Sequence, residues 1–242
     1  MCGRIPQHRT KATYVKEIGW PDTVLNDGVE ERPPNWNISP GTNPWLMHRF
    51  VDNRAQINSV NWGYRPAWAT EKNIPIAIDA RIEKLLTGGY FRVVFKSGRA
   101  IIPADGWYEW TGVADNKQPW YIHLQSESPM FMAAVTDYRS NIELPGYSGF
   151  AIVTTAAEGG LMDVHNRRPV VFTAADALLW MDNPASTTEA EQLARKMVLP
   201  AEAFHWYKVS KDVNKTVMHD AHLIQPIIEP QIIIWSSPLP NN

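Results

Sequence analysis

The sequence predicts a single α+β domain whose strand-rich core, either barrel-like or a twisted antiparallel sheet, is flanked by helices. The chain has 242 residues, of which 44% are hydrophobic and 20% are charged, so it can bury an ordinary core. Its 14 glycines and 19 prolines are spread along the chain, which is typical of short strands joined by many turns. Strand-like segments dominate the middle of the chain without alternating with helices, which favours α+β over βαβ units.

The first half of the chain predicts two helices and a hairpin. A short helix is expected over residues 10–19, with Thr10 as its N-cap. Residues 21–44 are rich in turn-forming residues and are expected to be irregular. Residues 45–50 and 55–62 read as the two strands of a hairpin. Residues 80–87 are compatible with a helix that ends at two glycines.

The second half predicts most of the sheet. Strands are expected over residues 99–103, 107–111, 119–124, 130–135, 149–154 and 204–209. One helix is expected to start at Thr173, because Asp176 follows at capping-box spacing, and another is expected over about 187–197. We expect the domain to span residues 1–228, followed by a C-terminal tail of residues 229–242.

Composition excludes several classes of protein. The chain has 23 Lys and Arg residues against 25 Asp and Glu, so its net charge gives no indication of a nucleic-acid partner. A basic cleft can still exist in a protein whose net charge is close to zero. A single cysteine excludes an internal disulfide and thiolate-rich metal sites. No apolar run is long enough for a membrane span, and the start lacks a signal-peptide core. We expect a cytoplasmic protein, associated with the nucleoid if it is bacterial, without metal, cofactor or membrane contact, and we expect it to be a monomer.

Cys2 is the first residue that points to chemistry. If Met1 is removed, Cys2 carries an amine and a thiol on adjacent carbons, and both groups are reactive near neutral pH. Such a 1,2-aminothiol condenses with an aldehyde to an imine, which the thiol closes to a five-membered thiazolidine. The alternative is that position 2 merely holds a small residue that permits trimming of Met1.

Glu109 is the second candidate. It lies in the segment from Ala104 to Trp110, where strand alternation puts Trp107 and Glu109 on one face. A carboxylate flanked by tryptophans is expected to be partly desolvated, and desolvation raises a carboxyl pKa toward the range useful for proton transfer. An exposed glutamate on a sheet face is the alternative.

Three further polar segments are weaker signals alone. Asn37 precedes a Pro-Gly turn and could present its amide into a cleft, or simply belong to the turn. Asp79 lies in a mixed charged segment that could be a solvated helix start. His165 precedes Arg167 and Arg168, whose planar guanidinium groups suit phosphates, but a lone histidine is more often structural.

Taken together, these segments resemble a known family. In chain order they are Met1-Cys2-Gly3-Arg4, Asn37-Ile38-Ser39-Pro40-Gly41, Asp79-Ala80-Arg81-Ile82-Glu83, Ala104-Asp105-Gly106-Trp107-Tyr108-Glu109-Trp110 and His165-Asn166-Arg167-Arg168-Pro169. They resemble the SOS response-associated peptidase family, the abasic-site processing proteins, and the resemblance extends over roughly residues 2–228.

The resemblance implies a function in DNA repair. Family members are described as capturing abasic sites in single-stranded DNA through a thiazolidine at the N-terminal cysteine, as releasing their own initiator methionine, and as having lyase or crosslink-reversal activity. It implies Cys2 as nucleophile, Asn37 as a hydrogen-bonding group near the crosslink, Glu109 as proton shuttle and His165 as the group acting on the sugar. It implies that Arg4, Arg81, Arg167 and Arg168 hold phosphates, and that Pro40 contacts DNA.

Three aromatic residues are candidates for stacking on bases. Trp68, Tyr90 and Phe91 could stack or wedge a strand, each stack being worth about 1–3 kcal/mol. Core packing is an equally good explanation for each of them.

One residue departs from the family pattern, because Asp79 stands where the family usually has Asn. An Asn amide can donate a hydrogen bond at the crosslink, whereas an ionised Asp cannot donate and adds negative charge beside phosphates. Either Asp79 is protonated, or it pairs with Arg81 or another cation, or the chemistry is slower; we expect activity that survives but is reduced.

Two other functions compete. Glutamine amidotransferases also begin Met-Cys-Gly, which would make this protein an N-terminal-nucleophile amidohydrolase, but the Asn-Gly-Asp element of those enzymes is absent here. A non-catalytic protein that binds single-stranded DNA is the second alternative.

Overall fold

The computed structural model describes residues 2–26, 30–50, 53–113, 116–139, 148–182 and 186–228. The strands are β1 (Ile5–Gln7), β2 (Asn35–Ile38), β3 (Trp45–His48), β4 (Gln56–Ser59), β5 (Asp79–Arg81), β6 (Arg99–Ala104), β7 (Trp107–Thr111), β8 (Gln118–Leu124), β9 (Met130–Thr136), β10 (Phe150–Ala156), β11 (Arg167–Pro169), β12 (Val171–Phe172) and β13 (Phe204–Lys208). The α-helices are α1 (Lys11–Glu17), α2 (Ala67–Glu71), α3 (Arg92–Ser97), α4 (Ala174–Met181) and α5 (Thr187–Met197). Short 3-10 turns include η2 (Ile82–Lys84), η4 (Gly159–Asp163), η5 (Ala201–Ala203), η6 (Lys211–Asn214) and η7 (Ala221–Ile224).

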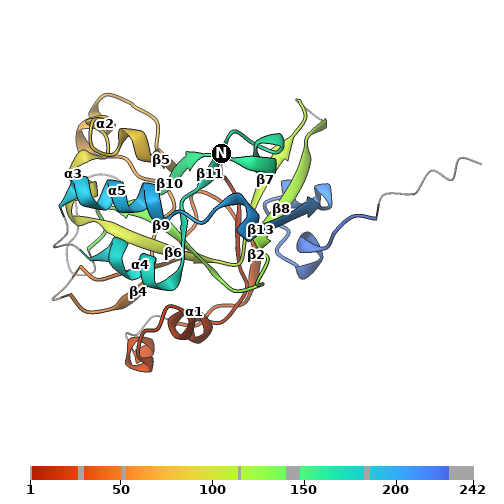
Figure 1. The fold of residues 1–242 in the computed structure, drawn as a ribbon, viewed down its shortest axis with the longest axis horizontal. Coiled ribbons are helices and arrows are strands. Elements are labelled where there is room, and N and C mark those ends of the chain that lie inside the picture. Colours follow the sequence, from red (N-terminus) through yellow and green to blue (C-terminus); the bar gives the residue numbers. More distant parts are fainter. Residues whose placement is uncertain are drawn as a thin grey trace, which may run out of the picture.

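The strands form three sheets (Figure 1). The largest follows the order β11-β10-β9-β6-β3-β4, with β12 paired to β9 and β5 paired to β10. Pairing is antiparallel except between β5 and β10, which run parallel. The sheets do not close, so the antiparallel alternative of the predicted α+β fold is confirmed and the barrel-like one is wrong.

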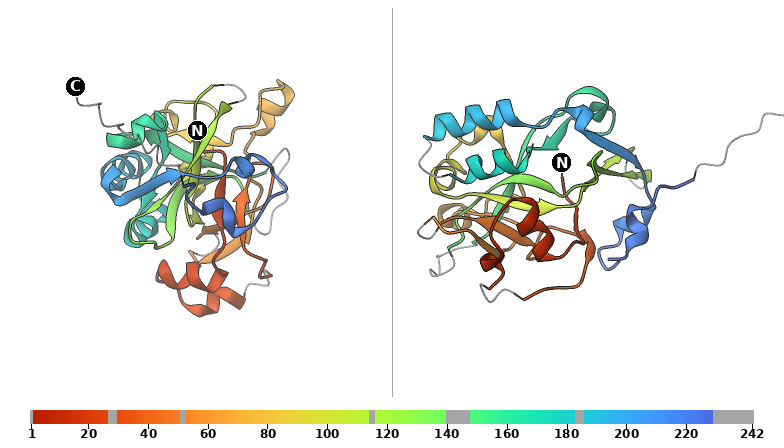
Figure 2. Two further views of the ribbon diagram at one scale, coloured as in Figure 1. Left: turned by 90° about the vertical axis from the view of Figure 1, so that its right-hand side faces the viewer. Right: turned by 60° about the horizontal axis from the view of Figure 1, so that its bottom comes forward.

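The central strands are buried on both faces, and alternate side chains enter two different clusters. On β9, Phe131, Ala133 and Val135 belong to one hydrophobic cluster, whereas Met130, Met132 and Ala134 belong to the other. The first cluster is covered by side chains of α1, α3, α4 and α5, and Figure 2 shows α4 and α5 together on one side of the sheet. The second cluster continues toward β1 and β7, where the candidate site lies.

The N-terminal segment is held against the start of β7. The Tyr108 N–H donates to the Arg4 carbonyl at 3.0 Å, and the Asp105 N–H donates to the Pro6 carbonyl at 3.0 Å. These bonds place the residues before Arg4 beside β7, which pairs with β8, while β13 forms the edge of that three-stranded sheet. Figure 1 shows the N-terminus near β7, β10 and β11.

Most predicted elements are confirmed. Thr10 and Thr173 cap α1 and α4 through their side chains, and α5 begins with a full capping box at Ser186 and Glu189. The strands expected between residues 99 and 154 all occur as β6 to β10, and those expected at 45–50, 55–62 and 204–209 occur as β3, β4 and β13.

Two predictions about local structure are wrong. Residues 80–87 do not form a helix: β5 pairs with β10 in this region and a single 3-10 turn follows, because pairing with a buried strand overrides a local helical pattern. The segment 21–44 is not wholly irregular, since β2 pairs with β1. The C-terminal tail, residues 229–242, lies outside the described residues.

Candidate functional site

Cys2 is fully buried beside two carboxyl groups. Its side chain has 0% exposure and packs in the second hydrophobic cluster with Trp62, Phe150 and Ile152. Burial raises the pKa of the Cys2 thiol, and the nearby charges of Asp79 and Glu109 raise it further. The thiol is therefore neutral near pH 7. Met1, the residue before it, lies outside the described residues.

Glu109 is the buried carboxyl group that the tryptophan-rich strand predicts. It is 3% exposed, and together with Trp107 it lines a small cavity that His165 also borders. Burial raises the pKa of Glu109 to about 7. The expected desolvation is confirmed, and the carboxyl group can take up and release a proton at neutral pH.

Asp79 occupies the first position of β5, opposite Ile152 on β10. Both of its carboxylate oxygens are inaccessible to solvent and accept no hydrogen bond from the residues that the structure describes. Burial, reinforced by the charge of Glu109, raises the pKa of Asp79 to about 7. Arg81 on the same strand is exposed to solvent. With this pKa, about half of the Asp79 side chains keep their proton at pH 7, although the charge of Arg167 opposes the rise.

His165 lies just after η4, and its ring is held by the backbone. His165 Nδ1 lies 2.9 Å from the Arg167 backbone nitrogen and 3.0 Å from the Arg167 carbonyl oxygen. Burial lowers the pKa of His165, so the neutral ring prevails near pH 7. His165 and Glu109 both line a cavity of about 440 Å³ that extends to Lys117 and Asn214.

The neighbouring arginines Arg167 and Arg168 have different environments. Arg167 forms a two-pronged ion pair with Glu83, with N–O distances of 2.9 and 3.1 Å, and also donates to the Thr154 carbonyl. Arg168 is 2% exposed, donates to the Leu199 carbonyl at 2.7 Å and lies over the Phe204 ring. Arg168 therefore holds the fold together and does not present its guanidinium group at the surface.

Asn37 is locked into the fold by carbonyl groups near η6. Its amide nitrogen lies 2.9 to 3.2 Å from the carbonyl oxygens of Val213, Lys215 and Met218, and its oxygen accepts a hydrogen bond of 2.7 Å from Arg4. Arg4 also donates to the Val213 carbonyl. In this structure Asn37 and Arg4 fasten the N-terminal region to η6, and their predicted contacts with DNA would require these bonds to exchange.

The remaining predicted DNA contacts lie in two other places. Trp68 on α2 is 41% exposed and meets Tyr90 edge to face, whereas Phe91 is buried against Tyr64. Tyr90 donates its hydroxyl to the carbonyls of Tyr64 and Pro75. Trp68 is thus the member of the three that can offer a face to a base. Pro40 lies in a half-buried turn that Gly41 closes with a positive φ of 84°.

Comparison of the sequence with known proteins identifies the family. The family model described as SOS response associated peptidase (SRAP) matches residues 1–216. The chain belongs to the SRAP family.

Relatives of this SRAP chain match over nearly its full length. Abasic site processing protein YedK of Escherichia coli is 36% identical over 231 residues, covering 94% of this chain and 100% of that protein. Abasic site processing protein HMCES of Xenopus tropicalis is 26% identical over 260 residues, covering 89% of this chain and 75% of that protein. The crystal structure of a phage-related protein from Bordetella bronchiseptica superposes with a TM-score of 0.71 at 35% identity, covering 87% of this chain and 95% of that one.

The SRAP site of this chain includes residues that sequence reasoning missed. Lys117 and Asn214 border the cavity shared by Glu109 and His165, and Asn214 accepts a 2.7 Å hydrogen bond from the Trp110 indole. Glu83 is part of a quoted motif, but its ion pair with Arg167 joins positions 84 residues apart. No pattern along the sequence signals these pairings, because Asn214 reaches Trp110 from η6 and Glu83 reaches Arg167 from η2, both far away along the chain.

Neither a metal site nor a membrane-spanning helix is found in the described ranges. No group of three or more His, Cys, Asp or Glu side chains there could hold a metal ion. No helix there is long and apolar enough to cross a bilayer.

Proposed function

We propose that this protein processes abasic sites in single-stranded DNA by linking the damaged sugar covalently to Cys2. The observation that carries the proposal is that Asp79 and Glu109 act on the buried Cys2 thiol, while His165 borders the same cavity as Glu109; the four residues come from separate stretches of the chain. The names of the relatives, abasic site processing proteins, point to the same lesion. DNA damage repair is the process to which the activity belongs.

The first step is hydrolysis of the Met1–Cys2 peptide bond. One water molecule is consumed: its oxygen joins the Met1 carbonyl carbon, and its hydrogens end on the products, methionine and the Cys2 amine. Glu109, with a pKa of about 7, takes a proton from the attacking group and returns it to the leaving amine. Release of Met1 would give Cys2 its 1,2-aminothiol and open the buried thiol to substrate.

The second step is capture of the ring-opened sugar. The Cys2 amine adds to the aldehyde carbon and water leaves, which gives an imine. The Cys2 sulfur then adds to the imine carbon, and the thiol proton ends on the ring nitrogen. One C–N and one C–S bond form for one water released, with no change of oxidation state. The raised pKa of the thiol means that sulfur is delivered from the neutral form, with Glu109 relaying the proton.

The surrounding groups supply orientation and phosphate contacts. The neutral ring of His165 can act on the sugar hydroxyl, both in opening the sugar ring and in reversing the crosslink. Arg81 is exposed at the end of β5 and can reach a phosphate directly, whereas Arg167 must first exchange its contact with Glu83. Trp68 offers a stacking face.

The decisive experiment is incubation with a single-stranded oligonucleotide carrying one abasic site, followed by a denaturing gel. We expect a shifted band that survives denaturant, is absent for Cys2→Ala, and is absent for the same oligonucleotide with an intact base. Cys2→Ala should keep weak, salt-sensitive binding. Equal non-covalent binding of both strands without any adduct would indicate a DNA-binding protein, and glutamine hydrolysis would indicate an amidohydrolase.

A further inference from the structure

The small cavity bordered by Glu109 and His165 has the size of a single water molecule. Its volume is about 10 Å³, and a cavity needs roughly 10–15 Å³ to hold one water. Three aliphatic side chains line it, together with five residues that carry polar groups: Trp107, Glu109, His165, Arg167 and Arg168. Of all these lining residues, only His165 and Arg167 are partly exposed. The cavity therefore lies mostly inside the fold.

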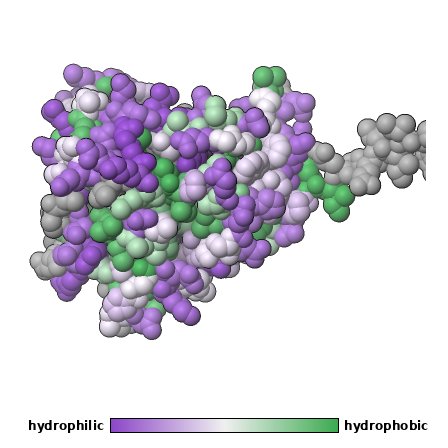
Figure 3. Space-filling model, viewed as in Figure 1, coloured by the Kyte–Doolittle hydropathy of each residue, from purple (hydrophilic) through white to green (hydrophobic). Residues whose placement is uncertain are grey.

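Residues that line this cavity carry buried N–H groups without an acceptor. Trp107 Nε1, Arg167 Nε and Arg168 Nε are inaccessible to solvent and have no hydrogen-bond partner among the residues that the structure describes. Each of these nitrogens can only donate, and a buried donor without an acceptor destabilises the folded state. On the outer surface Figure 3 shows many hydrophilic side chains, and bulk water can satisfy their hydrogen bonds there. Inside the fold, an acceptor has to be bound in the cavity.

The two most buried of these donors belong to side chains that other contacts hold in place. Trp107 is 1% exposed and meets the Phe204 ring edge to face, with ring centroids 5.2 Å apart. Arg168 is 2% exposed, lies 5.6 Å from the centroid of the same ring, and donates to the Leu199 carbonyl at 2.7 Å. Neither side chain can turn its N–H group to another acceptor without losing these contacts.

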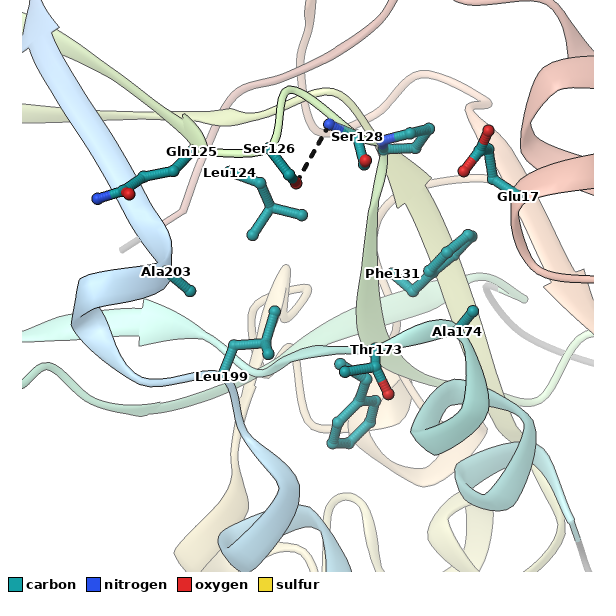
Figure 4. A pocket seen from close by; sticks show the side chains of 12 residues that line it. Glu17, Leu124, Gln125, Ser126, Ser128, Phe131, Thr173, Ala174, Leu199 and Ala203 are labelled. Atoms are coloured by element: carbon teal, nitrogen blue, oxygen red, sulfur yellow. Dashed lines mark hydrogen bonds between the residues drawn. The ribbon is translucent and has the colours of Figure 1, made fainter.

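A larger cavity on the same face of β8 has a different character. Ile122 lines the small cavity, whereas Leu124, two residues further along the strand, lines a cavity of about 420 Å³ together with Phe131, Ala174 and Leu199 (Figure 4). Among the described residues, none that lines this larger cavity has a buried polar side-chain atom without a hydrogen-bond partner. Of the two cavities, the small one therefore has the donors that a bound water needs.

We propose that one water molecule occupies the small cavity, accepts hydrogen bonds from Trp107 and Arg168, and bridges Glu109 to His165. The two lone pairs of the water serve the two most buried donors, and its two hydrogens point to the carboxyl group and the imidazole ring. All four hydrogen-bonding positions of the water are then used, which is the arrangement that keeps a water inside a protein. Trp107 is thereby a positioning residue, which acts on Glu109 through the water.

The water also passes protons between the two acid–base groups, a role that rests on the proposed function. Opening the sugar ring moves one proton from the C1′ hydroxyl to the ring oxygen. His165 takes the hydroxyl proton and Glu109 gives its own proton to the ring oxygen, which leaves His165 protonated and Glu109 ionised. The water then gives one proton to Glu109 while it accepts one from His165. No water is consumed, and both groups return to their starting forms.

Nuclear magnetic resonance tests the water directly. In protein labelled with ¹⁵N, the indole N–H signal of Trp107 is identified by its absence in Trp107→Phe. We expect a rotating-frame Overhauser cross-peak between this N–H and water, with the sign of dipolar contact and not of hydrogen exchange. A Trp107 indole signal without such a cross-peak would overturn the proposal. The measurement uses no DNA, so its failure does not bear on the proposed function.

A cavity-filling variant tests the occupant by the sign of its effect on stability. Val164 lines the small cavity, and Val164→Ile adds one methyl group there. If the methyl group displaces a water, two buried donors lose their acceptor, so the urea midpoint should fall and the cross-peak should vanish. In a dry cavity the same variant would fill a void and raise the midpoint, which would overturn the proposal. Ala174→Val in the larger cavity is the matched control and should keep the cross-peak.

The proton relay has a separate readout. Initial rates of adduct formation are measured in mixtures of H₂O and D₂O, and because two protons move in the relay, the plot of rate against deuterium fraction should be curved for the wild type. Val164→Ile should lower the rate by at least about tenfold and make the plot linear, whereas Ala174→Val should keep both unchanged. A linear plot for the wild type would overturn the relay. A wild-type protein that forms no adduct would instead count against the proposed function.

Discussion

Asp79 on β5 and Glu109 on β7 act on the same buried sulfur, since the charge of each raises the pKa of the Cys2 thiol. The two carboxyl groups also affect one another, because the charge of Glu109 helps to raise the pKa of Asp79 to about 7. Close to neutral pH, ionising both places two negative charges around an uncharged thiol. The site therefore favours states in which at least one of the carboxyl groups keeps its proton.

Replacing Asp79 with Asn should raise the yield of the DNA adduct at alkaline pH. With a pKa of about 7, only about one tenth of Asp79 is protonated at pH 8, and the ionised form cannot donate a hydrogen bond. Asp79→Asn keeps a donor at every pH. We expect a gain of about twofold at pH 7 and about tenfold at pH 8, since the gain should equal the reciprocal of the protonated fraction of Asp79. The gain is measured from initial rates of adduct formation on abasic single-stranded DNA between pH 5.5 and 8.5. A ratio of the Asp79→Asn rate to the wild-type rate that stays constant over this range would contradict the prediction.

The free energy of unfolding should also depend on pH through the ionisation of Asp79. The folded-state pKa of Asp79 lies above its ordinary value, so the native state binds this proton more tightly than the unfolded chain. The stability that this proton contributes is complete below about pH 4 and is lost as pH rises through about 7, by on the order of 4 kcal/mol for this group. Asp79→Asn should remove this fall, so its urea midpoint should match the wild type near pH 4 and exceed it at pH 8.

The control for that measurement is Asp22→Asn, at an exposed position in the 3-10 turn after α1. It removes one carboxylate without touching the site, so its urea midpoint should follow that of the wild type at each pH. If the stability difference between Asp79→Asn and the wild type does not vary with pH, the pKa of Asp79 is not raised by folding.

The sequence was informative wherever the relevant contacts were local. The cap of α4 is one example: Thr173 accepts from the Asp176 N–H and donates to the Asp176 carboxylate, all within four residues. The burial of Glu109 is another, because strand alternation alone places it with Trp107. In both cases the interacting groups are neighbours along the chain, and the pattern can be recognised directly.

The sequence was uninformative where partners are distant. Asn37 gives its amide to the Val213 carbonyl, 176 residues away, so nothing near it indicates that the donor is already used. Arg167 and Arg168 are adjacent and chemically identical, and only the position of β11 beside β10 decides that one lies near the site and the other inside the fold. The parallel pairing of β5 is likewise set by β10 rather than by local propensity.

Glu109→Gln should slow both covalent steps. Glutamine keeps the size and the hydrogen-bonding capacity of the side chain but cannot take up a proton, and general acid–base catalysis contributes about 10²–10⁴-fold to such reactions. We expect both release of Met1 and adduct formation to slow by at least about tenfold. Mass spectrometry of freshly expressed protein measures the release of Met1, and a denaturing gel measures adduct formation. If Met1 is released as fast as in the wild type, Glu109 has no part in self-processing, and the gel alone then tests its part in the capture of the sugar.

Glu83→Gln should strengthen binding to single-stranded DNA by freeing Arg167. The wild-type pair satisfies two N–H groups of Arg167 and cancels its charge, and Glu83 is itself partly exposed, so its loss should cost at most about 1 kcal/mol of stability. With the carboxylate gone, Arg167 can turn to a phosphate, and the salt dependence of binding should steepen by close to one counterion. The matched control is Glu191→Gln, which breaks the Arg195–Glu191 pair on α5. The affinity of both variants for single-stranded DNA is measured at several salt concentrations. If Glu83→Gln and Glu191→Gln raise the affinity equally, only net charge matters and the Glu83–Arg167 pair does not restrain a DNA contact.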